Sequence, residues 1–214
     1  MGANDIDPNT GTTPRFVSRG FTGRARRARS ARLPPGQYDV GTGFPVLSAG
    51  PTPNTHLSRW DFTVQGQVDQ VRHYSWAEFR SLPREDVEVD IHCVTSWSKF
   101  DTRWEGVSVD TLLGDVESEA EYALAFSDGG YTTNLPLADL TGGRAWVVDT
   151  YDGAPLRPEH GGPARLLVPH LYFWKSAKWV RGLVLGEVEE LGFWERFGYH
   201  RYGDPWRQQR YAGD

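Results

Sequence analysis

Val87-Glu-Val-Asp-Ile-His-Cys-Val-Thr-Ser-Trp-Ser-Lys99 is the most informative stretch of the chain. Apolar and polar residues alternate from Val87 to Ile91, which predicts a half-buried β-strand. His92 and Cys93 follow where this strand runs out into a loop, and loops that leave a rigid strand commonly carry functional side chains. The stretch therefore joins a predicted strand end to the single cysteine of the chain.

Cys93 has three interpretations on the residues alone. It is a buried structural thiol, the commoner case for an arbitrary cysteine, or a nucleophile working with a histidine, or a metal ligand. His92 and Lys99 lie close in the sequence, and either would favour the thiolate. The six histidines are scattered and none forms a signature with Cys93, so the spacing does not choose among the three.

The sequence carries no sign of export or membrane insertion. One cysteine cannot form an internal disulfide, so nothing points to an oxidising compartment. No run of about eighteen apolar residues is present, which excludes a membrane span on length. Arg26-Arg27 is typical of twin-arginine signals, but Ala28–Arg32 follows where such a signal needs an apolar stretch. We therefore expect a cytoplasmic protein without a membrane span.

Short strands and few, brief helices are predicted on both sides of this stretch. Trp60–Val64 alternates as a strand should, and Gly66 closes it. Ser75–Leu82 begins with a capping serine and should form a short helix. The other expected elements are strands at Tyr122–Phe126, Trp146–Tyr151, Ala164–Val168 and Val180–Glu187, a loop at Gly41–Pro53, a helical turn at Val107–Leu113, a turn at Ser127–Gly130, a hairpin turn at Asp152-Gly153, and a short helix or turn at Glu189–Phe197. This pattern indicates an α+β fold.

Composition supports one packed domain. The 214 residues are 38% hydrophobic and include nine Trp, nine Tyr and ten Phe, enough to build a core. No internal repeat or clean linker divides the chain. We therefore predict a flexible basic N-terminal arm at residues 1–35, a single domain at residues 36–197, and a C-terminal tail at residues 198–214 that packs on the domain.

The charges of the chain are distributed unevenly. Arg15–Arg32 holds seven arginines and no acid, which leaves 16 basic and 28 acidic residues elsewhere, for a net charge of -5. The arm is then either a solvated tail or a strap on the acidic body. Nucleic-acid binding is a weaker third interpretation, because the body would repel phosphate, and no nucleic-acid partner is expected.

A second candidate site lies between Asp152 and Lys178. His160, Arg165 and two lysines, Lys175 and Lys178, gather in a Gly/Pro-rich region where the backbone can approach a ligand closely. Such donors suit an anionic ligand rich in heteroatoms, whereas two lysines alone would more often form a solvated basic face. Arg165 stands inside an apolar strand, where a charge normally has a partner, and this weakens the surface interpretation.

Residues 40–190 resemble the sulfite oxidase type of molybdopterin-binding domain, and within it the small bacterial branch that includes methionine sulfoxide reductase catalytic subunits. The resemblance implies a mixed-sheet fold in one domain. The matching stretches, in chain order, are Phe44–Gly50, the Trp60 strand, Cys93–Ser98, Trp104–Val107, Leu112-Leu113, His160–Arg165, Leu166–Pro169 and Lys175–Lys178.

The resemblance also implies the cofactor and its ligands. Cys93 matches the single protein ligand to molybdenum, and a soft thiolate suits a metal that a pterin dithiolene already binds. His92, Lys99 or Trp97 would line the substrate side. The residues implied to contact the molybdenum-molybdopterin cofactor are Val46, Leu47 and Ser48 in a first loop, Ser127 at a turn, and His160, Arg165, Ser176, Ala177 and Lys178 around the pterin and its phosphate.

The expected activity is a two-electron oxygen-atom transfer on a small substrate. Sulfite or a sulfoxide is favoured by the family analogy alone. Animal and plant sulfite oxidases hold sulfite with arginines just before and after the cysteine, but this chain has His92 and Val94–Trp97 there. No haem or iron-sulfur ligand set is present, so a separate electron donor or acceptor is expected.

Two alternatives from other classes stay open. The first is a cysteine-dependent hydrolase, for which Cys93 needs a histidine base in reach. The second is a non-catalytic domain that binds the cofactor or serves in assembly. In the tail, His200, Asp204 and Trp206 either fold over the pocket or cover the surface.

Overall fold

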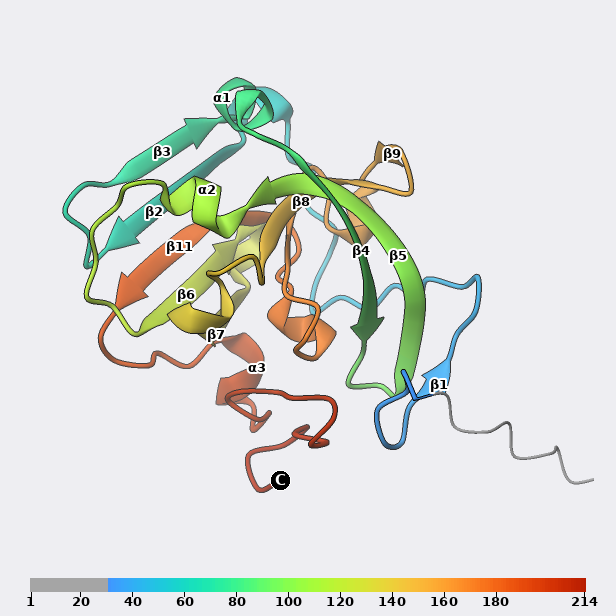
Figure 1. Cartoon of the computed structure of the whole chain (residues 1–214). Coiled ribbons are helices and arrows are strands. Elements are labelled where there is room, and N and C mark those ends of the chain that lie inside the picture. The colour runs from blue at the N-terminus through green and yellow to red at the C-terminus, as the bar shows by residue number, and fades with distance from the viewer. Residues whose placement is uncertain (1–30) are drawn as a thin grey trace, which may run out of the picture. The chain divides into compact units, whose positions relative to one another are not determined.

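The strand predicted at Val87–Ile91 belongs to β4 (Glu85–His92), which pairs antiparallel with the long strand β5 (Trp97–Ser108). These two strands and their connection hold the whole stretch around Cys93 (Figure 1). The structure is a computed structural model that describes residues 31–214. The predictions made for residues 1–30, including most of the arginine-rich arm, lie outside the described residues.

The first sheet is built around β5. It has the order β1-β5-β8-β10, with β4 paired to β5 and β9 paired to β8. The remaining strands of this sheet are β1 (Tyr38–Asp39), β8 (Trp146–Tyr151), β9 (Ala154–Pro155) and β10 (Arg165–Leu167). The short strand β1 runs parallel to β5, whereas β4 and β8 run antiparallel to it, so the sheet is mixed.

The second sheet has five strands in the order β3-β2-β11-β6-β7. They are β2 (Asp61–Gly66), β3 (Arg72–Ser75), β6 (Tyr122–Ser127), β7 (Thr132–Pro136) and β11 (Val180–Gly186). Strand β11 pairs parallel with β2 and antiparallel with β6, which makes this sheet mixed as well (Figure 1). The predicted α+β class with mixed sheets is confirmed.

The helices are brief. Helix α1 (Trp76–Ser81) starts from the predicted capping box, in which Ser75 accepts from the Glu78 amide and Glu78 accepts from the Ser75 amide. The other helices are α2 (Val109–Leu113), α3 (Phe193–Arg196), and five 3-10 turns, η1 (Leu57–Arg59), η2 (Asp128–Gly130), η3 (Leu137–Asp139), η4 (Pro158–His160) and η5 (Phe173–Lys175). Within residues 31–214, no helix has the length and apolar character to cross a membrane.

Strand β5 was not predicted, and its end corrects one expected helix. Val107 and Ser108 belong to β5, so the helical turn starts only at Val109, with the Ser108 hydroxyl accepting from the Thr111 amide. Asp101, within the strand, has a positive φ of 53°, a backbone conformation that is uncommon for a residue with a side chain. Gly106 is required later in β5, because a Cβ there would overlap the Val147 carbonyl.

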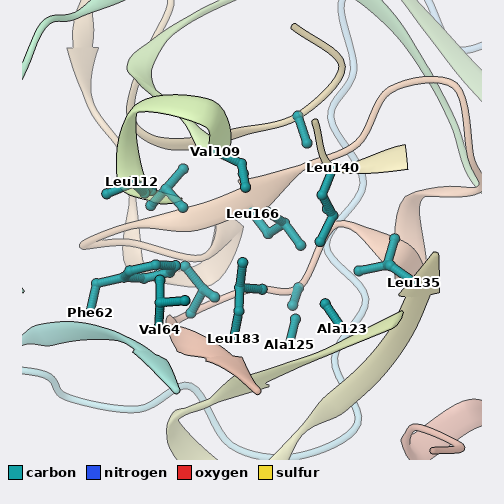
Figure 2. Close-up of a cluster of buried hydrophobic side chains, with 14 of the residues drawn as sticks. Phe62, Val64, Val109, Leu112, Ala123, Ala125, Leu135, Leu140, Leu166 and Leu183 are labelled. Atoms are coloured by element: carbon teal, nitrogen blue, oxygen red, sulfur yellow. The ribbon is translucent and has the colours of Figure 1, made fainter. Parts of the chain in front are cut away.

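The main core lies between the second sheet and the elements that cover it. Figure 2 shows Phe62 and Val64 of β2, the alanines of β6 and Leu183 of β11 facing Val109 and Leu112 of α2 and Leu166 of β10. These residues are almost fully buried, which supplies the main hydrophobic stabilisation of the fold. Leu166 joins this core while its neighbour Arg165 points elsewhere, since successive side chains of a strand face opposite sides.

Candidate active site

One large cavity lies beside the first sheet, with a volume of about 600 Å³. This volume is within the range of small-molecule and cofactor sites. Residues from five parts of the chain line it. The lining includes Leu47, Ser48, Cys93, Thr95, Asp128, His160, Arg165, Ser176 and Lys178.

Cys93 is held at the cavity wall by a tight turn. Its amide donates to the Trp97 carbonyl (2.8 Å), and its carbonyl accepts from the Ser96 amide (3.0 Å) and the Gln37 side-chain amide (3.0 Å). The Sγ atom lies 3.2 Å from the Thr95 hydroxyl. Burial raises the pKa of the Cys93 thiol, so the thiolate needs a further stabilising group, such as a metal ion.

Arg165 is the strongest sign of an anionic ligand. Its side chain is buried at 1% exposure and lines the cavity, with the guanidinium 3.9 Å from the Phe173 ring centroid. It donates to the His160 carbonyl (2.8 Å) and the Ser176 carbonyl (2.6 Å), and within residues 31–214 no carboxylate pairs with it. Burial lowers the pKa of Arg165 to about 9, which leaves it protonated at neutral pH. A buried charge of this kind fits an anion.

Lys178 and His160 extend the cationic side of the cavity. Lys178 donates to the carbonyls of Leu47 (2.8 Å) and Glu159 (2.7 Å), and burial together with the charge of Arg165 lowers the pKa of Lys178 to about 8. The His160 ring stacks on Phe44, with centroids 4.0 Å apart. Burial, followed by the charge of Arg165, lowers the pKa of His160 and keeps its ring neutral.

A glycine allows these cations to approach one another. Gly161 has a φ of 110°, which side-chain-bearing residues rarely adopt. A Cβ at this position would lie 3.1 Å from the Arg165 Cβ and 3.1 Å from the Lys178 Cα. Gly161 therefore allows Arg165 and Lys178 to pack closely beside the cavity.

The structure brings most of the proposed cofactor contacts together. Leu47, Ser48, His160, Arg165, Ser176 and Lys178 line the same cavity as Cys93, although they lie far apart in the sequence. Three others are absent from its lining. Val46 is exposed, Ala177 is buried with its carbonyl accepting from the Leu166 amide, and the buried Ser127 hydroxyl has no hydrogen-bond partner among the described residues.

His92 and Lys99 do not line the cavity, where the sequence analysis expected them. The His92 Nδ1 atom lies 2.8 Å from the Ser98 hydroxyl, and its ring lies against Trp206 of the tail. Lys99 donates to the Gly41 carbonyl (3.0 Å). The expected support of a Cys93 thiolate by either residue is therefore corrected, since neighbouring residues of a strand point to opposite faces. Trp97 does line the cavity, as expected.

One side of the cavity is an aromatic wall that was not predicted from the sequence. This wall consists of Tyr131, Trp174, Phe193, Trp194 and Tyr199. Phe193 and Trp194 come from α3 and Tyr199 from the tail, whereas the tail residues considered earlier, His200, Asp204 and Trp206, are not in the lining. The dense aromatic run Gly192-Phe-Trp-Glu-Arg-Phe-Gly-Tyr199 was the available signal.

The chemistry of the cavity fits a pterin-held metal. Among the described residues no cluster of three or more His, Cys, Asp or Glu side chains could hold a metal by itself. A thiol in one cavity with two cations that form no ion pair among the described residues suits instead a metal carried by an anionic organic cofactor. For a hydrolase, Cys93 would need a histidine base, but its side chain contacts Thr95 and no hydrogen bond joins it to a histidine within residues 31–214.

Comparison with known proteins gives the same cofactor. A family profile described as "Oxidoreductase molybdopterin binding domain" matches residues 49–194. An oxidoreductase of Bacillus subtilis (strain 168), named "Uncharacterized oxidoreductase YuiH", is 42% identical over 198 residues, which cover 91% of this chain and 100% of that protein. The catalytic subunit MsrP of a protein-methionine-sulfoxide reductase from Pseudomonas syringae pv. tomato is 26% identical over 188 residues, which cover 78% of this chain and 55% of MsrP.

A further relative and a solved structure are also similar to this chain. A putative protein-methionine-sulfoxide reductase subunit, YedZ1 of Azospira oryzae, is 28% identical over 142 residues, which cover 65% of this chain and 54% of that protein. The sulfane dehydrogenase SoxCD from Paracoccus pantotrophus has the same fold, with a TM-score of 0.58 and 18% identity over 64% of this chain and 41% of that one. The resemblance seen in the sequence is confirmed: the chain belongs to the oxidoreductase molybdopterin-binding domain family, of the sulfite oxidase type, and its cofactor is molybdopterin.

Proposed function

We propose that this oxidoreductase transfers an oxygen atom between water and a small organic sulfur compound, with a sulfoxide as the first candidate, and exchanges electrons with a separate protein. Two relatives named as methionine-sulfoxide reductase subunits support the substrate class. The single observation that carries the proposal is that the buried Cys93 thiol faces one cavity with Arg165 and Lys178, two cations that form no ion pair with a carboxylate in the part of the chain that the structure describes.

The residues on the cavity wall divide into two groups by chemistry. Cys93 would bind the metal through Sγ, and Arg165, Lys178 and the neutral ring of His160 would hold the anionic and heteroatom-rich parts of the cofactor. The bound cofactor supplies two-electron redox chemistry with oxygen-atom transfer. The chain contributes the orientation of these groups, because the guanidinium is already fixed by two backbone carbonyls.

The aromatic wall favours an organic substrate over sulfite. Trp174, Phe193 and Trp194 offer apolar surface that excludes water and suits a carbon-bearing group next to the sulfur. Positions 92 and 94–97 carry no arginine to hold a small inorganic anion. A sulfoxide has one strong acceptor oxygen and apolar substituents, which match this mixture of side chains.

Metal analysis of Cys93→Ser tests the proposal. Produced in a host that makes molybdopterin, the wild-type protein should contain close to one molybdenum atom per chain and reduce sulfoxides with a viologen dye as electron donor. Cys93→Ser should lose the activity by about a hundredfold or more, because a hard hydroxyl replaces the thiolate ligand. Thr95→Val is the matched control, since it removes the hydroxyl next to Sγ and keeps the thiol.

Other outcomes favour other functions. A wild-type protein without molybdenum would sink the proposal, and activity lost in Cys93→Ser with no metal in either protein would indicate the hydrolase. Turnover of sulfite or N-oxides in place of sulfoxides would keep the oxidoreductase and overturn the substrate class. Bound molybdenum without turnover of any of these compounds would support a binding or assembly module.

A further inference from the structure

A fully buried ion pair lies directly behind the aromatic wall. The side chains of Lys175 and Glu195 are both 0% exposed, and Lys175 Nζ lies 2.7 Å from Glu195 Oε1. The ammonium also donates to the Asn134 carbonyl (2.8 Å), to Asn134 Oδ1 (2.9 Å) and to the Arg201 carbonyl. The pair thus joins β7, η5, α3 and the tail. A fully desolvated ion pair adds little net stability, because the cost of removing both charges from water offsets their attraction.

Glu195 holds the wall through a second hydrogen bond. Its Oε1 atom accepts from the Trp174 indole N–H at 2.9 Å and from the Thr133 hydroxyl at 3.2 Å. Trp174 lines the cavity, and so do Phe193 and Trp194, the two residues that precede Glu195 on α3. One carboxylate oxygen therefore fixes the two chain segments, η5 and α3, that supply most of the aromatic wall.

The carboxylate itself has little freedom to move. Glu195 Oε2 is buried and has no hydrogen-bond partner among the described residues. A Cβ at Gly192 would lie 2.5 Å from Oε2 and 2.5 Å from the Thr133 Cα, so only glycine allows α3 to approach β7 this closely. A buried oxygen without a hydrogen bond lowers the stability of the folded state, so the position of Glu195 is fixed by the hydrogen bonds of Oε1 and not by those of Oε2.

The Trp174 indole contacts several neighbouring groups besides the cavity that it lines. It stacks on Tyr172, with centroids 5.3 Å apart and planes at 18°, and its edge meets the Tyr199 ring at 5.4 Å. Its carbonyl accepts from the Tyr131 hydroxyl at 2.6 Å. A Cβ at Gly203 would lie 2.8 Å from the indole Cζ2. The indole N–H bond to Glu195 completes this set and selects a single orientation.

We propose that Glu195 is a positioning residue, which together with Lys175 fixes the Trp174 indole and helix α3 as a rigid wall on the substrate side of the cavity. The assignment of this wall to the substrate rests on the proposed function. Functional side chains are effective when neighbouring groups lock their orientation, and a wall that only contacts bound substrate should affect binding more than chemistry.

Fluorine NMR tests the positioning without any need for turnover. In protein labelled with 5-fluorotryptophan, Trp174 is assigned as the one of nine tryptophan signals that Trp174→Phe removes. Glu195→Ala should shift and broaden the Trp174 and Trp194 signals. Glu195→Gln keeps an acceptor oxygen and should restore most of the Trp174 shift. Glu88→Gln, which changes the exposed pair with Arg103, is the matched control and should leave both signals unchanged.

Kinetics test the assignment to the substrate side. In the cofactor-loaded protein, with free methionine sulfoxide and a reduced viologen, Glu195→Ala should raise KM by about tenfold and change kcat by less than about threefold. Its molybdenum content should equal that of the wild type. Trp174→Phe, which keeps an aromatic ring and loses the N–H, should show a smaller rise in KM.

Each result either supports or overturns the proposal. An unchanged Trp174 signal in Glu195→Ala would overturn the positioning role, and a loss of molybdenum or of kcat with constant KM would overturn the substrate-side assignment. If Glu195→Ala does not fold, the charge-free double variant Lys175→Met/Glu195→Leu takes its place; it also removes the acceptor of the Trp174 indole N–H, so the same direction is expected. Wild-type protein inactive on sulfoxides would contradict the proposed function alone, because the NMR result does not depend on turnover.

Discussion

Arg165 and Lys175 are both fully buried cations from neighbouring segments of the chain, yet their surroundings differ in one respect. Lys175 has a carboxylate partner, Glu195, and its charge is balanced within the protein. Arg165 donates to two backbone carbonyls, lies against the Phe173 ring and faces the cavity, and it forms no ion pair with a carboxylate within residues 31–214. A buried charge without an opposite charge is unfavourable in an isolated protein. We infer from this difference that Lys175 has a structural role, whereas Arg165 is available to bind an anionic ligand in the cavity.

Arg165→Met should give the largest effect on the cofactor. The truncation of a buried, hydrogen-bonded charge facing an opposite charge costs about 2 to 5 kcal/mol of binding free energy. Cofactor affinity should therefore fall by about 30-fold or more. The measurement is the pterin and molybdenum content of the purified protein. Arg144→Met, at an exposed arginine that pairs with Asp139, is the control and should keep full content.

For the stability of the cofactor-free protein, the comparison predicts a larger effect from the substitution of Lys175 than from that of Arg165. Lys175→Met leaves Glu195 buried without a counter-charge, which should lower the free energy of unfolding by about 3 to 5 kcal/mol. Arg165→Met in cofactor-free protein should cost less, because no carboxylate loses its partner. Urea unfolding of the two variants provides the test, and the addition of Glu195→Gln to Lys175→Met should recover part of the loss. Equal losses in both single variants would show that the two cations have the same role.

Gly192→Ala tests whether the close approach of α3 to β7, which places Glu195 beside Lys175, stabilises the fold. The added Cβ would meet Glu195 Oε2, the Thr133 Cα and the Thr132 carbonyl at 2.5 to 2.7 Å. Helix α3 must then move away from β7, which should destabilise the protein by about 1 to 3 kcal/mol. Gly186→Ala is the matched control, because the nearest atom to a Cβ there is the Val188 carbonyl at 3.8 Å. If Gly186→Ala lowered the free energy of unfolding by the same amount, the loss in Gly192→Ala could not be attributed to the close approach of α3 to β7.

The sequence predicts Cys93 and Arg165 better than it predicts the aromatic wall of the cavity. Cys93 and Arg165 stand out locally, one as the single cysteine after a strand and the other as a charge in an apolar strand. His92 and Lys99 were misplaced because proximity in the sequence does not give the direction of a side chain. The aromatic run around Trp194 is visible in the sequence, but its contact with the segment of Trp174 joins distant parts of the chain, and no local pattern predicts that contact.

The same distinction applies to the fold. The capping box at Ser75 and the alternation from Val87 to Ile91 are local signals, and both elements form as predicted. Strand β5 is held by its neighbours β4 and β8 in spite of the positive φ of Asp101, so its length follows from pairing and not from its own pattern. Long-range pairing therefore determines the part of the fold that the sequence left undefined.

Substitution of Lys178 should have the smallest effect on stability, and the direction of this effect with pH can be predicted. Burial, followed by the charge of Arg165, lowers the pKa of Lys178 in the cofactor-free protein from 10.5 to about 8. Below pH 8 the amine is protonated in both the folded and the unfolded chain, and the folded state carries the full penalty of the buried charge. Between pH 8 and 10.5 only the unfolded chain keeps the proton, so stability rises with pH.

Lys178→Met should therefore be more stable than the cofactor-free wild type at pH 7, and this advantage should disappear above about pH 10.5. Urea unfolding at pH 7 and pH 10 measures the difference, with Lys99→Met as the control at a lysine that bonds to the Gly41 carbonyl outside the cavity. An advantage that does not change with pH would contradict the assignment. In the loaded protein the sign should reverse, because the protonated amine of Lys178 then faces an anion, and its removal costs both cofactor and stability.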